Sequence, residues 1–534
     1  MPKPAPRIVD ELSNRELKEQ FLDLLDVVSE QKHLIRELRD EIARLKGGSG
    51  RPKIKPNKPS GMEQASEKKA LPNKDDKRRG RGRKKLLRMP IEDQIIAAQE
   101  VPEGSRFKGY EDFTIQDLVI HPKAIRFRRE RWVTPDGRTV VASLPCGIED
   151  HFGPELRRFI LIQYHQGQVT VDRLVKQLDA IGIEISKRQV VRLLIDGQDS
   201  FVTEAGAVLH RGLQTSAWVT VDDTGARHKA KNGFCTQIGN DRFAWFCTTN
   251  SKSRVNFLGL LRAGHNDYII DAQALSYMRT RNLSQSVIDR LAKADDKSFD
   301  NLAAWQAHLE RLGITALKSK VDPVRIATEG ALWGSIKAHG LLDETVIVSD
   351  DAGQFNVGRH GLCWVHAERL IHRIEAFSER TRAIQQEVRG LIWDFYGDLK
   401  AYCRNPDQKQ KTALQARFDD IFKRRTGFAI LDRLLKRLHA NKAELLMALE
   451  RPEIPLHTNG SENDIRCQVT KRRISGGTRS DAGRDCRDTF LSLLKTCDKL
   501  GISFWEYLGH RLSVTGAKAV PYLPDLVGMR SPVI

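Results

Sequence analysis

Residues 218–224 read WVTVDDT, and this stretch decides the class of fold. Aromatic and β-branched residues fill its first four positions, which predicts a buried strand that ends at the aspartates. A second run of this kind, residues 345–351, reads TVIVSDD. Long segments around both runs carry apolar residues at spacings of three and four, as helices do. The sequence therefore predicts an α/β fold with large helical additions.

Each predicted strand ends in a carboxylate, Asp222 in the first and Asp350 in the second. Aspartate is common where strands turn, but two such ends indicate acidic groups gathered at one edge of a sheet. Gathered carboxylates repel one another unless a cation holds them, and hard oxygen ligands suit Mg²⁺ or Mn²⁺. Side chains alternate along a strand, so Asp222 shares a face with Thr220 while Asp223 points the other way. We therefore take Asp222 as the metal ligand.

A third carboxylate, Glu462, lies in residues 457–466, which read HTNGSENDIR. Asn459 and Glu462 also have the spacing of a capping box, and Glu462 and Arg466 have that of an ion pair on a surface helix. The cations that follow favour a role near phosphates instead. The candidate DNA-binding residues of this region are Arg466, Lys471, Arg472 and Arg473.

Charge and composition limit the class of protein. The 534 residues include 88 Lys and Arg against 69 Asp and Glu, a net charge of +19, which favours a polyanion as partner. No apolar run approaches the ~20 residues that span a bilayer, and the N-terminus lacks the apolar region of a secretion signal. We expect a cytosolic, multidomain protein that binds nucleic acid and has no membrane partner. The eight cysteines include no Cys-x-x-Cys pair, which argues against a disulfide scaffold.

The first segment, residues 1–47, contains an apolar seam with a period of 3.5 residues. Phe21, Val28 and Ile35 share one heptad position, and leucines fill the other except at Gln31. This pattern favours a parallel coiled coil, and we predict a homodimer or higher oligomer through it. The alternative is a helix that packs on its own protein.

The composition and charge of residues 48–90 predict a flexible basic linker. Within them, residues 51–88 hold 15 Lys or Arg and 4 Asp or Glu and are rich in Pro and Gly. Such a linker binds phosphates without reading bases, whereas a minor-groove hook is the alternative that we favour less. The candidate DNA-binding residues here are Arg78, Arg79, Arg81, Arg83, Lys84 and Lys85.

Two further segments precede the first predicted strand. Residues 91–150 predict a small β-rich segment around a turn at residues 135–137. Residues 151–212 predict three helices, the last with Ser186 as N-cap. The last two helices and their glycine-containing turn resemble a DNA-binding helix-turn-helix, although any helical hairpin can imitate one. The last helix would present Lys187, Arg188 and Arg192 to DNA.

The joint order of these features resembles the DDE transposases of the insertion sequence 66 family. Matching segments spread over about residues 150–510 and read FGPELRRFILIQYHQGQVTVDRLVKQLDAIGIEIS, VTVDDTGARH, VIVSDD, CWVHAERL, HTNGSENDIR and LLKTCDKLGISFWEYLGHRL. The resemblance implies a ribonuclease-H-like catalytic domain over residues 213–498, with a C-terminal tail over 499–534. The wide spacing of the carboxylates adds predicted helical insertions at about 260–335 and 367–450.

The resemblance also implies the site and its chemistry. The catalytic and metal-binding triad would be Asp222, Asp350 and Glu462, with two Mg²⁺ or Mn²⁺ ions per active site. The partners would be double-stranded DNA, as element ends and as target, and accessory proteins encoded by the same element. The reaction would be hydrolysis at the 3′ ends, followed by attack of the freed 3′-OH on target DNA. Both steps are in-line displacements at phosphorus without a covalent protein intermediate.

Three positions need separate comment. The family's Cys-x-x-His matches Cys363 and His366, whose role the residues do not assign; with His360 and His372 nearby, a zinc site is the alternative to the structural helix face that we favour. Only Cys146 remains of the cysteine-rich zinc segment common in the family, so we expect that metal to be lost. The family's Asp-Glu-Thr motif reads Asp-Asp-Thr here.

Two rival functions stay open at this point. One is a transposase-derived DNA-binding protein without catalysis, against which the intact carboxylates argue. The other is a related ribonuclease-H-fold nuclease, which fits the coiled coil and the helical insertions less well.

Overall fold

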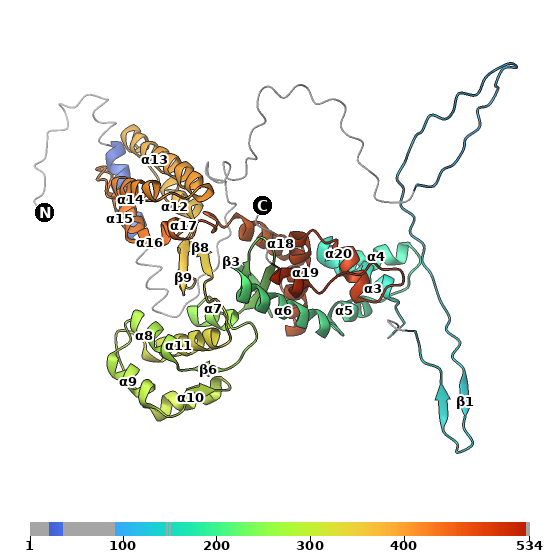
Figure 1. Cartoon of the computed structure of the whole chain (residues 1–534), viewed down its shortest axis with the longest axis horizontal. Coiled ribbons are helices and arrows are strands. Elements are labelled where there is room, and N and C mark those ends of the chain that lie inside the picture. Colours follow the sequence, from blue (N-terminus) through green and yellow to red (C-terminus); the bar gives the residue numbers. More distant parts are fainter. Residues whose placement is uncertain (1–20, 36–90, 146–147, 149–150, 530–534) are drawn as a thin grey trace, which may run out of the picture.

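The computed structural model describes residues 21–35, 91–145, 148 and 151–529. These residues form a mixed α/β fold in which helical groups surround one central sheet (Figure 1). Among the helices of this part of the chain, none combines the length and apolar composition needed to cross a membrane. The basic linker, with its six candidate residues between 78 and 85, and Cys146 lie outside the described residues.

The central sheet has five strands in the order β5-β4-β3-β8-β9. β3, β4 and β5 pair antiparallel, whereas β3, β8 and β9 pair parallel. Both strands predicted from the apolar runs are present, as β3 and β8. The strand bounds are β3 Trp218–His228, β4 Lys231–Gly239, β5 Ala244–Thr249, β8 Val346–Ser349 and β9 Arg359–Leu362.

The predicted end of the first strand at Asp222 is wrong, because β3 continues to His228. Its pairing with β4 reaches His228 opposite Lys231, across a two-residue turn. Both turn residues, Lys229 and Ala230, have positive φ angles of 47° and 60°. Two residues of positive φ make the tight turn that matches the twist of a hairpin, so the hairpin keeps β3 extended past the aspartates.

One helical group precedes the sheet, and a second and a third interrupt the chain after β5 and after β9, near the positions predicted for insertions (Figure 1). The first group contains α3 Pro154–Leu161, the π-helix η2 Ile162–Gln166, α4 Val171–Ala180, α5 Lys187–Ile195 and α6 Asp199–Thr215. The second contains α7 Arg254–Leu261, β6 Tyr268–Ile269, α8 Ala272–Thr280, α9 Gln285–Lys293, β7 Ser298–Phe299, α10 Leu302–Arg311 and α11 Pro323–Ala338. The third contains α12 Trp364–His372, α13 Glu379–Arg404, α14 Gln408–Phe422, α15 Ala429–Ala440, α16 Lys442–Leu445 and α17 Met447–Glu450.

The chain then returns to the sheet and to the first helical group. The returning helices are α18 Asn459–Ser475, α19 Asp481–Leu500, α20 Phe504–Arg511 and α21 Leu523–Gly528. Phe490 of α19 packs on Phe201 of α6, with ring centroids 5.0 Å apart, and Leu523 of α21 is fully buried. The segment predicted only as a C-terminal tail is therefore helical and shares one continuous core with residues 154–215.

Residues 21–35 are helical, and their polar side contacts α13 and its surroundings. The Asp26 carboxylate accepts hydrogen bonds from the Phe377 N–H at 2.9 Å and from the Thr381 hydroxyl at 3.2 Å. Two residues of the predicted seam, Phe21 and Ile35, stay 60% and 48% exposed. The helix thus packs on its own chain through polar residues and leaves seam residues open, and the coiled coil remains a prediction.

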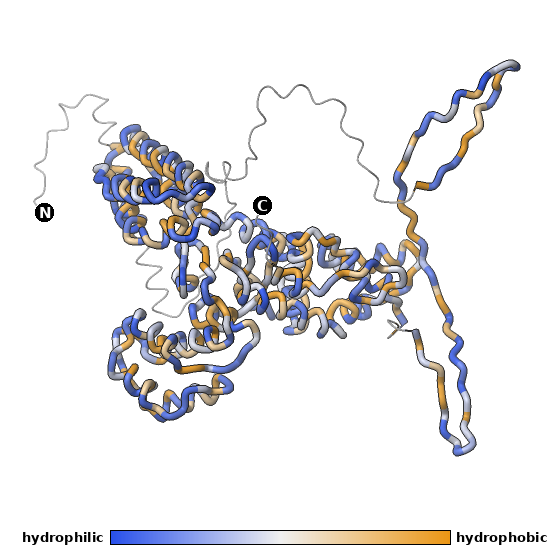
Figure 2. Tube along the Cα trace, in the orientation of Figure 1, coloured by the Kyte–Doolittle hydropathy of each residue, from blue (hydrophilic) through white to orange (hydrophobic). Residues whose placement is uncertain are grey.

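The predicted β-rich segment forms only one short hairpin. Its strands are β1 Arg131–Val133 and β2 Thr139–Val141, joined at the predicted turn. The other described residues between 91 and 145 have no regular secondary structure, and they extend away from the body of the molecule although they carry many apolar residues (Figures 1 and 2). The wider β prediction is wrong because no neighbouring element pairs with these residues.

Candidate functional site

Asp222 and Asp350 stand level at one edge of the central sheet. In the parallel register of β3 and β8, Thr220 pairs with Val348. Two residues further along each strand are Asp222 and Asp350. Since parallel strands advance in step, both carboxylates reach the same edge. The two carboxylates therefore lie at one edge of the sheet, where the sequence analysis expected acidic groups to gather.

Helix α18 brings the third carboxylate to the same place. The hydroxyls of Thr220 on β3 and Ser461 on α18 lie 2.6 Å apart and are buried, so this end of the helix is fixed against the strand. Glu462 follows Ser461 and is itself buried. The three predicted site residues therefore meet where β3, β8 and α18 converge.

Neither alternative role for Glu462 is present. Thr458 holds the N-cap position of α18 and makes no side-chain capping bond, so the capping box predicted from Asn459 is wrong. Arg466 is exposed, and the Glu462 carboxylate contacts two residues of α12 instead. Its Oε1 lies 3.3 Å from Nε2 of His366 and 3.3 Å from Nη2 of Arg369. Both cations orient the carboxylate from the side of α12.

The pKa of Asp222 reflects its burial close to other carboxylates. Burial raises the pKa of Asp222 to about 7, and His366 opposes the rise. The charges of Asp350, Asp223 and Glu462 add to it. Like charges disfavour the ionised form at close range, and a cation would favour it. The site is thus an acidic cluster in which a bound cation would be stabilised.

The neighbouring aspartates point elsewhere. The Asp223 carboxylate lies 2.7 Å from Nζ of Lys252 and accepts a hydrogen bond of 2.9 Å from Nε2 of Gln354. Asp351 pairs with Arg437 on α15. The predicted alternation along β3 is confirmed, and it supports the choice of Asp222 over Asp223.

Cys363 and His366 lie at the start of α12, beside this cluster. Burial opposes a charge on either group, but their mutual attraction and hydrogen bond prevail. The pKa of the Cys363 thiol is held below its ordinary value, and that of His366 is raised to about 10, with help from Glu462 and Asp350. The position of His366 and Arg369 against Glu462 was not predicted from the sequence; the only signal was the Cys-x-x-His motif.

The predicted zinc alternative for this motif is not supported. His360 instead contacts the Ser349 hydroxyl at 2.8 Å and the Glu444 carboxylate at 3.0 Å. The described residues contain one group of three or more His, Cys, Asp or Glu whose ligand atoms all lie within 4.8 Å, and it is His265, Asp267 and His339. The oxygens of Asp222, Asp350 and Glu462 are therefore spaced more widely than that. They remain hard donors of the type that fits Mg²⁺ or Mn²⁺.

The candidate DNA-binding residues divide into exposed and buried ones. Ser186 and Gln189 form the capping box at the start of α5, which confirms Ser186 as N-cap. The predicted outward residues of α5, Lys187, Arg188 and Arg192, are exposed. On α18, Arg466 and Arg473 are also exposed, whereas Arg472 is half-buried.

Lys471 is wrongly predicted as an outward phosphate ligand, because it is 5% exposed. Consecutive residues of a helix point ~100° apart, so the run Lys-Arg-Arg cannot face solvent throughout. The Lys471 ammonium donates a hydrogen bond of 2.6 Å to the Tyr164 carbonyl and lies 3.5 Å from the centre of the Tyr164 ring. Burial, with a contribution from Arg487, lowers its pKa to about 7.

This burial predicts a pH dependence of stability. Unfolding restores the ordinary Lys pKa of ~10.4, so between pH ~7 and ~10 the unfolded chain binds more protons than the folded one. The free energy of unfolding should therefore rise across this range, and Lys471→Met should remove that part of the rise. Chemical denaturation of both proteins at pH 7 and pH 9.5 measures the difference. Equal pH dependence in the two proteins would contradict the assignment.

Comparison with known proteins agrees with the resemblance. A family model described as Transposase IS66 family matches residues 338–485, which include β8, α12 and α18 with Asp350, His366 and Glu462. The chain is also 48% identical over 314 residues to "Uncharacterized protein y4jO" of Sinorhizobium fredii (strain NBRC 101917 / NGR234). That match covers 59% of this chain and 97% of the relative.

Proposed function

Because the chain belongs to the IS66 family of transposases, we propose that it cuts the 3′ ends of a bacterial insertion sequence and joins them to target DNA. The observation that carries the proposal is the meeting of three carboxylates from β3, β8 and α18. Residues from distant parts of the chain converge there, and Asp222 has a pKa raised to about 7.

The sheet supports the proposal that the catalytic domain is ribonuclease-H-like. The middle strand β3, which carries Asp222, pairs antiparallel with β4 on one side and parallel with β8 on the other. This order sets β3 next to β8, so that one carboxylate comes from each of two adjacent strands. The two helical groups follow β5 and β9 in the chain, and α12 of the later group brings His366 and Arg369 against Glu462.

The acidic donors define how the proposed site would work. Asp222, Asp350 and Glu462 would hold two Mg²⁺ or Mn²⁺ ions, which activate an attacking oxygen and stabilise a leaving oxygen in phosphodiester chemistry. His366 and Arg369 hold Oε1 of Glu462 at 3.3 Å each and so orient this carboxylate. Thr220 and Ser461 keep α18 in register with β3.

DNA binding is proposed for the exposed cations. Arg188 and its neighbours on α5 are available for the helix-turn-helix role, and Arg466 and Arg473 are exposed on α18, the helix that carries Glu462. The linker cations would add phosphate contacts that do not depend on sequence. The coiled coil would pair two protomers, and accessory proteins of the element would complete the assembly.

A cleavage assay on the DNA that flanks the reading frame tests this function. We expect purified protein to bind that DNA and to cut it at 3′ ends when Mg²⁺ or Mn²⁺ is added. Ca²⁺ should support binding without cutting, because its coordination is looser and more variable. Labelled DNA ends separated on a denaturing gel measure the products.

Two outcomes would contradict the proposal. Binding to the end DNA without cleavage in either metal would favour the silent DNA-binding protein. Cleavage of any duplex, with no joining of the freed 3′ ends to a second DNA, would favour the related nuclease.

A further inference from the structure

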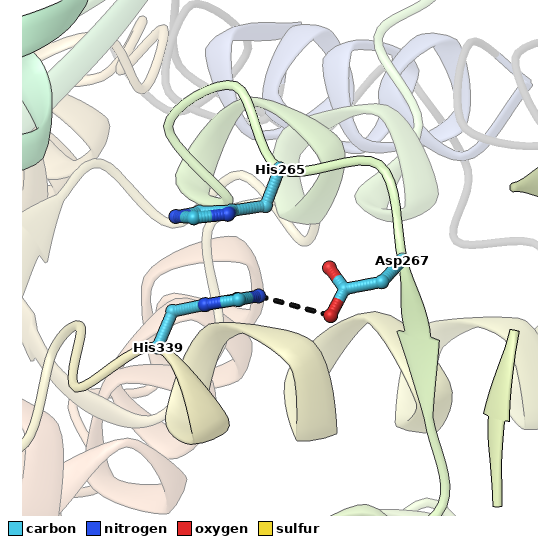
Figure 3. A group of neighbouring side chains, drawn as sticks. All are labelled: His265, Asp267 and His339. Carbon is cyan, nitrogen blue, oxygen red and sulfur yellow. Dashed lines mark hydrogen bonds and ion pairs between the residues drawn. The ribbon is translucent and has the colours of Figure 1, made fainter. Parts of the chain in front are cut away.

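Three side chains outside the candidate site meet on the second helical group. The rings of His265 and His339 lie one above the other, with the Asp267 carboxylate beside them (Figure 3). The ring centroids are 3.5 Å apart and the planes differ by 7°, so one ring has to turn out of the stack before both nitrogens can point at one ion. Nε2 of His339 lies 2.9 Å from Oδ2 of Asp267. One ligand atom from each residue lies within 4.8 Å of the other two.

The local fold brings these residues together from two places in the sequence. His265 and Asp267 lie in the loop between α7 and β6, where Ala263 and Gly264 turn the chain with φ angles of 49° and 96°. His339 is the C-cap residue of α11. Arg262 donates a hydrogen bond of 2.9 Å to the Asp267 carbonyl and so fixes the loop.

We propose that His265, Asp267 and His339 form a Zn²⁺-binding site separate from the proposed catalytic centre. Two imidazole nitrogens and one carboxylate oxygen are ligands that Zn²⁺ binds well, whereas Mg²⁺ prefers oxygen alone. Three protein ligands leave the fourth position of a tetrahedral ion for water. The site shares no residue with the acidic cluster, and it does not depend on the proposed function.

The surroundings of Asp267 resemble the outer shell of a metal site. The Ser335 hydroxyl donates a hydrogen bond of 2.7 Å to Oδ1 of Asp267 and orients the carboxylate toward the histidines. The side chains of His339 and Asp267 are 31% and 22% exposed, so an ion can reach them from solvent.

A second His–Asp pair in the chain provides a matched comparison. Nε2 of His439 lies 2.8 Å from Oδ1 of Asp419, much as in the proposed site. The same oxygen, however, lies 2.8 Å from Nζ of Lys442, and a lysine ammonium there excludes a metal cation. A His–Asp contact alone therefore does not make a site. The proposed zinc site differs from this pair in its second histidine and in the position left open for the ion.

Zinc would join parts of the chain that are distant in sequence. It would tie the loop after α7 to the end of α11, and the ring of His210 on α6 lies near, 5.7 Å from that of His265. The same region contains a hydrogen bond from the Leu342 N–H to the Leu213 carbonyl. A metal here would strengthen the connection between the second helical group and the segment that leads into β8.

Zinc titration of the full chain tests the proposal. The protein is purified with a chelator and carries Asp222→Asn, Asp350→Asn and Glu462→Gln, so that the acidic cluster contributes no metal ligand. Competition with a coloured zinc chelator should detect one Zn²⁺ per chain. His265→Asn and His339→Asn should each weaken binding by more than about 100-fold, and Ser335→Ala by about 10-fold, as expected for loss of a ligand and of an outer partner. His439→Asn should bind zinc as tightly as the parent.

Two further measurements separate loss of a ligand from loss of the fold. The circular dichroism of each variant in chelator should match that of the parent. Zinc at a hundredfold excess over its Kd should raise the melting temperature of the parent by roughly 2 °C and leave His265→Asn and His339→Asn unchanged. With Co²⁺ in place of zinc, the parent should give the strong visible absorption of a four-coordinate ion.

Three results would overturn the proposal. One is a parent protein that takes up no zinc at micromolar concentration. Another is zinc binding that survives both histidine substitutions. The third is weak, six-coordinate Co²⁺ absorption in the parent, which would also decide the matter if a histidine variant failed to fold.

Discussion

Asp222→Asn is expected to lower the rate of 3′-end cleavage by about a thousandfold or more, with DNA affinity unchanged. The amide nearly preserves the shape of the side chain but removes a charge from the acidic cluster at the edge of β3. The exposed cations that would bind DNA lie on α5 and α18, so binding should survive. Single-turnover cleavage and a filter-binding assay on the same end DNA measure the two effects separately. Asp350→Asn and Glu462→Gln should behave in the same way.

Asp351→Asn is the matched control, because Asp351 follows the same strand but pairs with Arg437. It should retain most of the activity. Asp223→Asn tests the register of β3, since Asp223 contacts Lys252 and Gln354 on the opposite face. Loss of activity in Asp223→Asn with retention in Asp222→Asn would show that the wrong aspartate has been assigned. Activity in Glu462→Gln would remove Glu462 from the catalytic residues.

Glu204→Ala should have the largest effect on stability, about 3–5 kcal/mol in the free energy of unfolding. The Glu204 carboxylate on α6 is almost fully buried. It accepts hydrogen bonds from the Tyr507 hydroxyl at 2.8 Å, from Nε of Arg511 at 2.9 Å and from the Leu523 N–H at 3.1 Å. Truncation leaves a mostly buried guanidinium and two other donors without their acceptor.

Asp196→Ala provides the control, because the Asp196 side chain is 64% exposed and lies 3.4 Å from Arg192. An exposed pair of this kind contributes about 0–1 kcal/mol. Denaturant unfolding of the two variants and the parent measures the difference. Equal effects would show that α20 and α21 do not stabilise the first helical group as their contacts indicate.

Local patterns predicted much of the fold. The apolar runs identified β3 and β8, and Ser186 marked the start of α5, because both signals depend on residues close in sequence. Alternation along β3 also distinguished Asp222 from Asp223 before their contacts were known. In each case one short segment contains all the information needed.

The wrong or missing predictions concern residues whose positions depend on contacts with distant parts of the chain. Lys471 reads as a surface cation until the position of Tyr164 is known, and the contact of His366 with Glu462 joins residues of different helices. Of the β-rich segment expected over residues 91–150, the described residues form only the hairpin of β1 and β2, because β structure requires a partner strand. His265 and Asp267 can be recognised as possible metal ligands only once α11 is seen to bring His339 close to them. Tertiary contacts decided these positions, and no local pattern encodes them.

The contact between Thr220 and Ser461 joins residues 241 positions apart, and this separation has a consequence for biosynthesis. Ribosomes add about 5–20 residues per second, so roughly 12–50 s pass between synthesis of the strand and synthesis of the helix that completes the acidic cluster. During that interval the growing polypeptide carries one carboxylate of the three until residue 350 has been added, and two of the three after that. If the acidic cluster is the proposed catalytic site, a nascent chain, or one released early by a premature stop codon, would lack the third carboxylate and should not cut DNA.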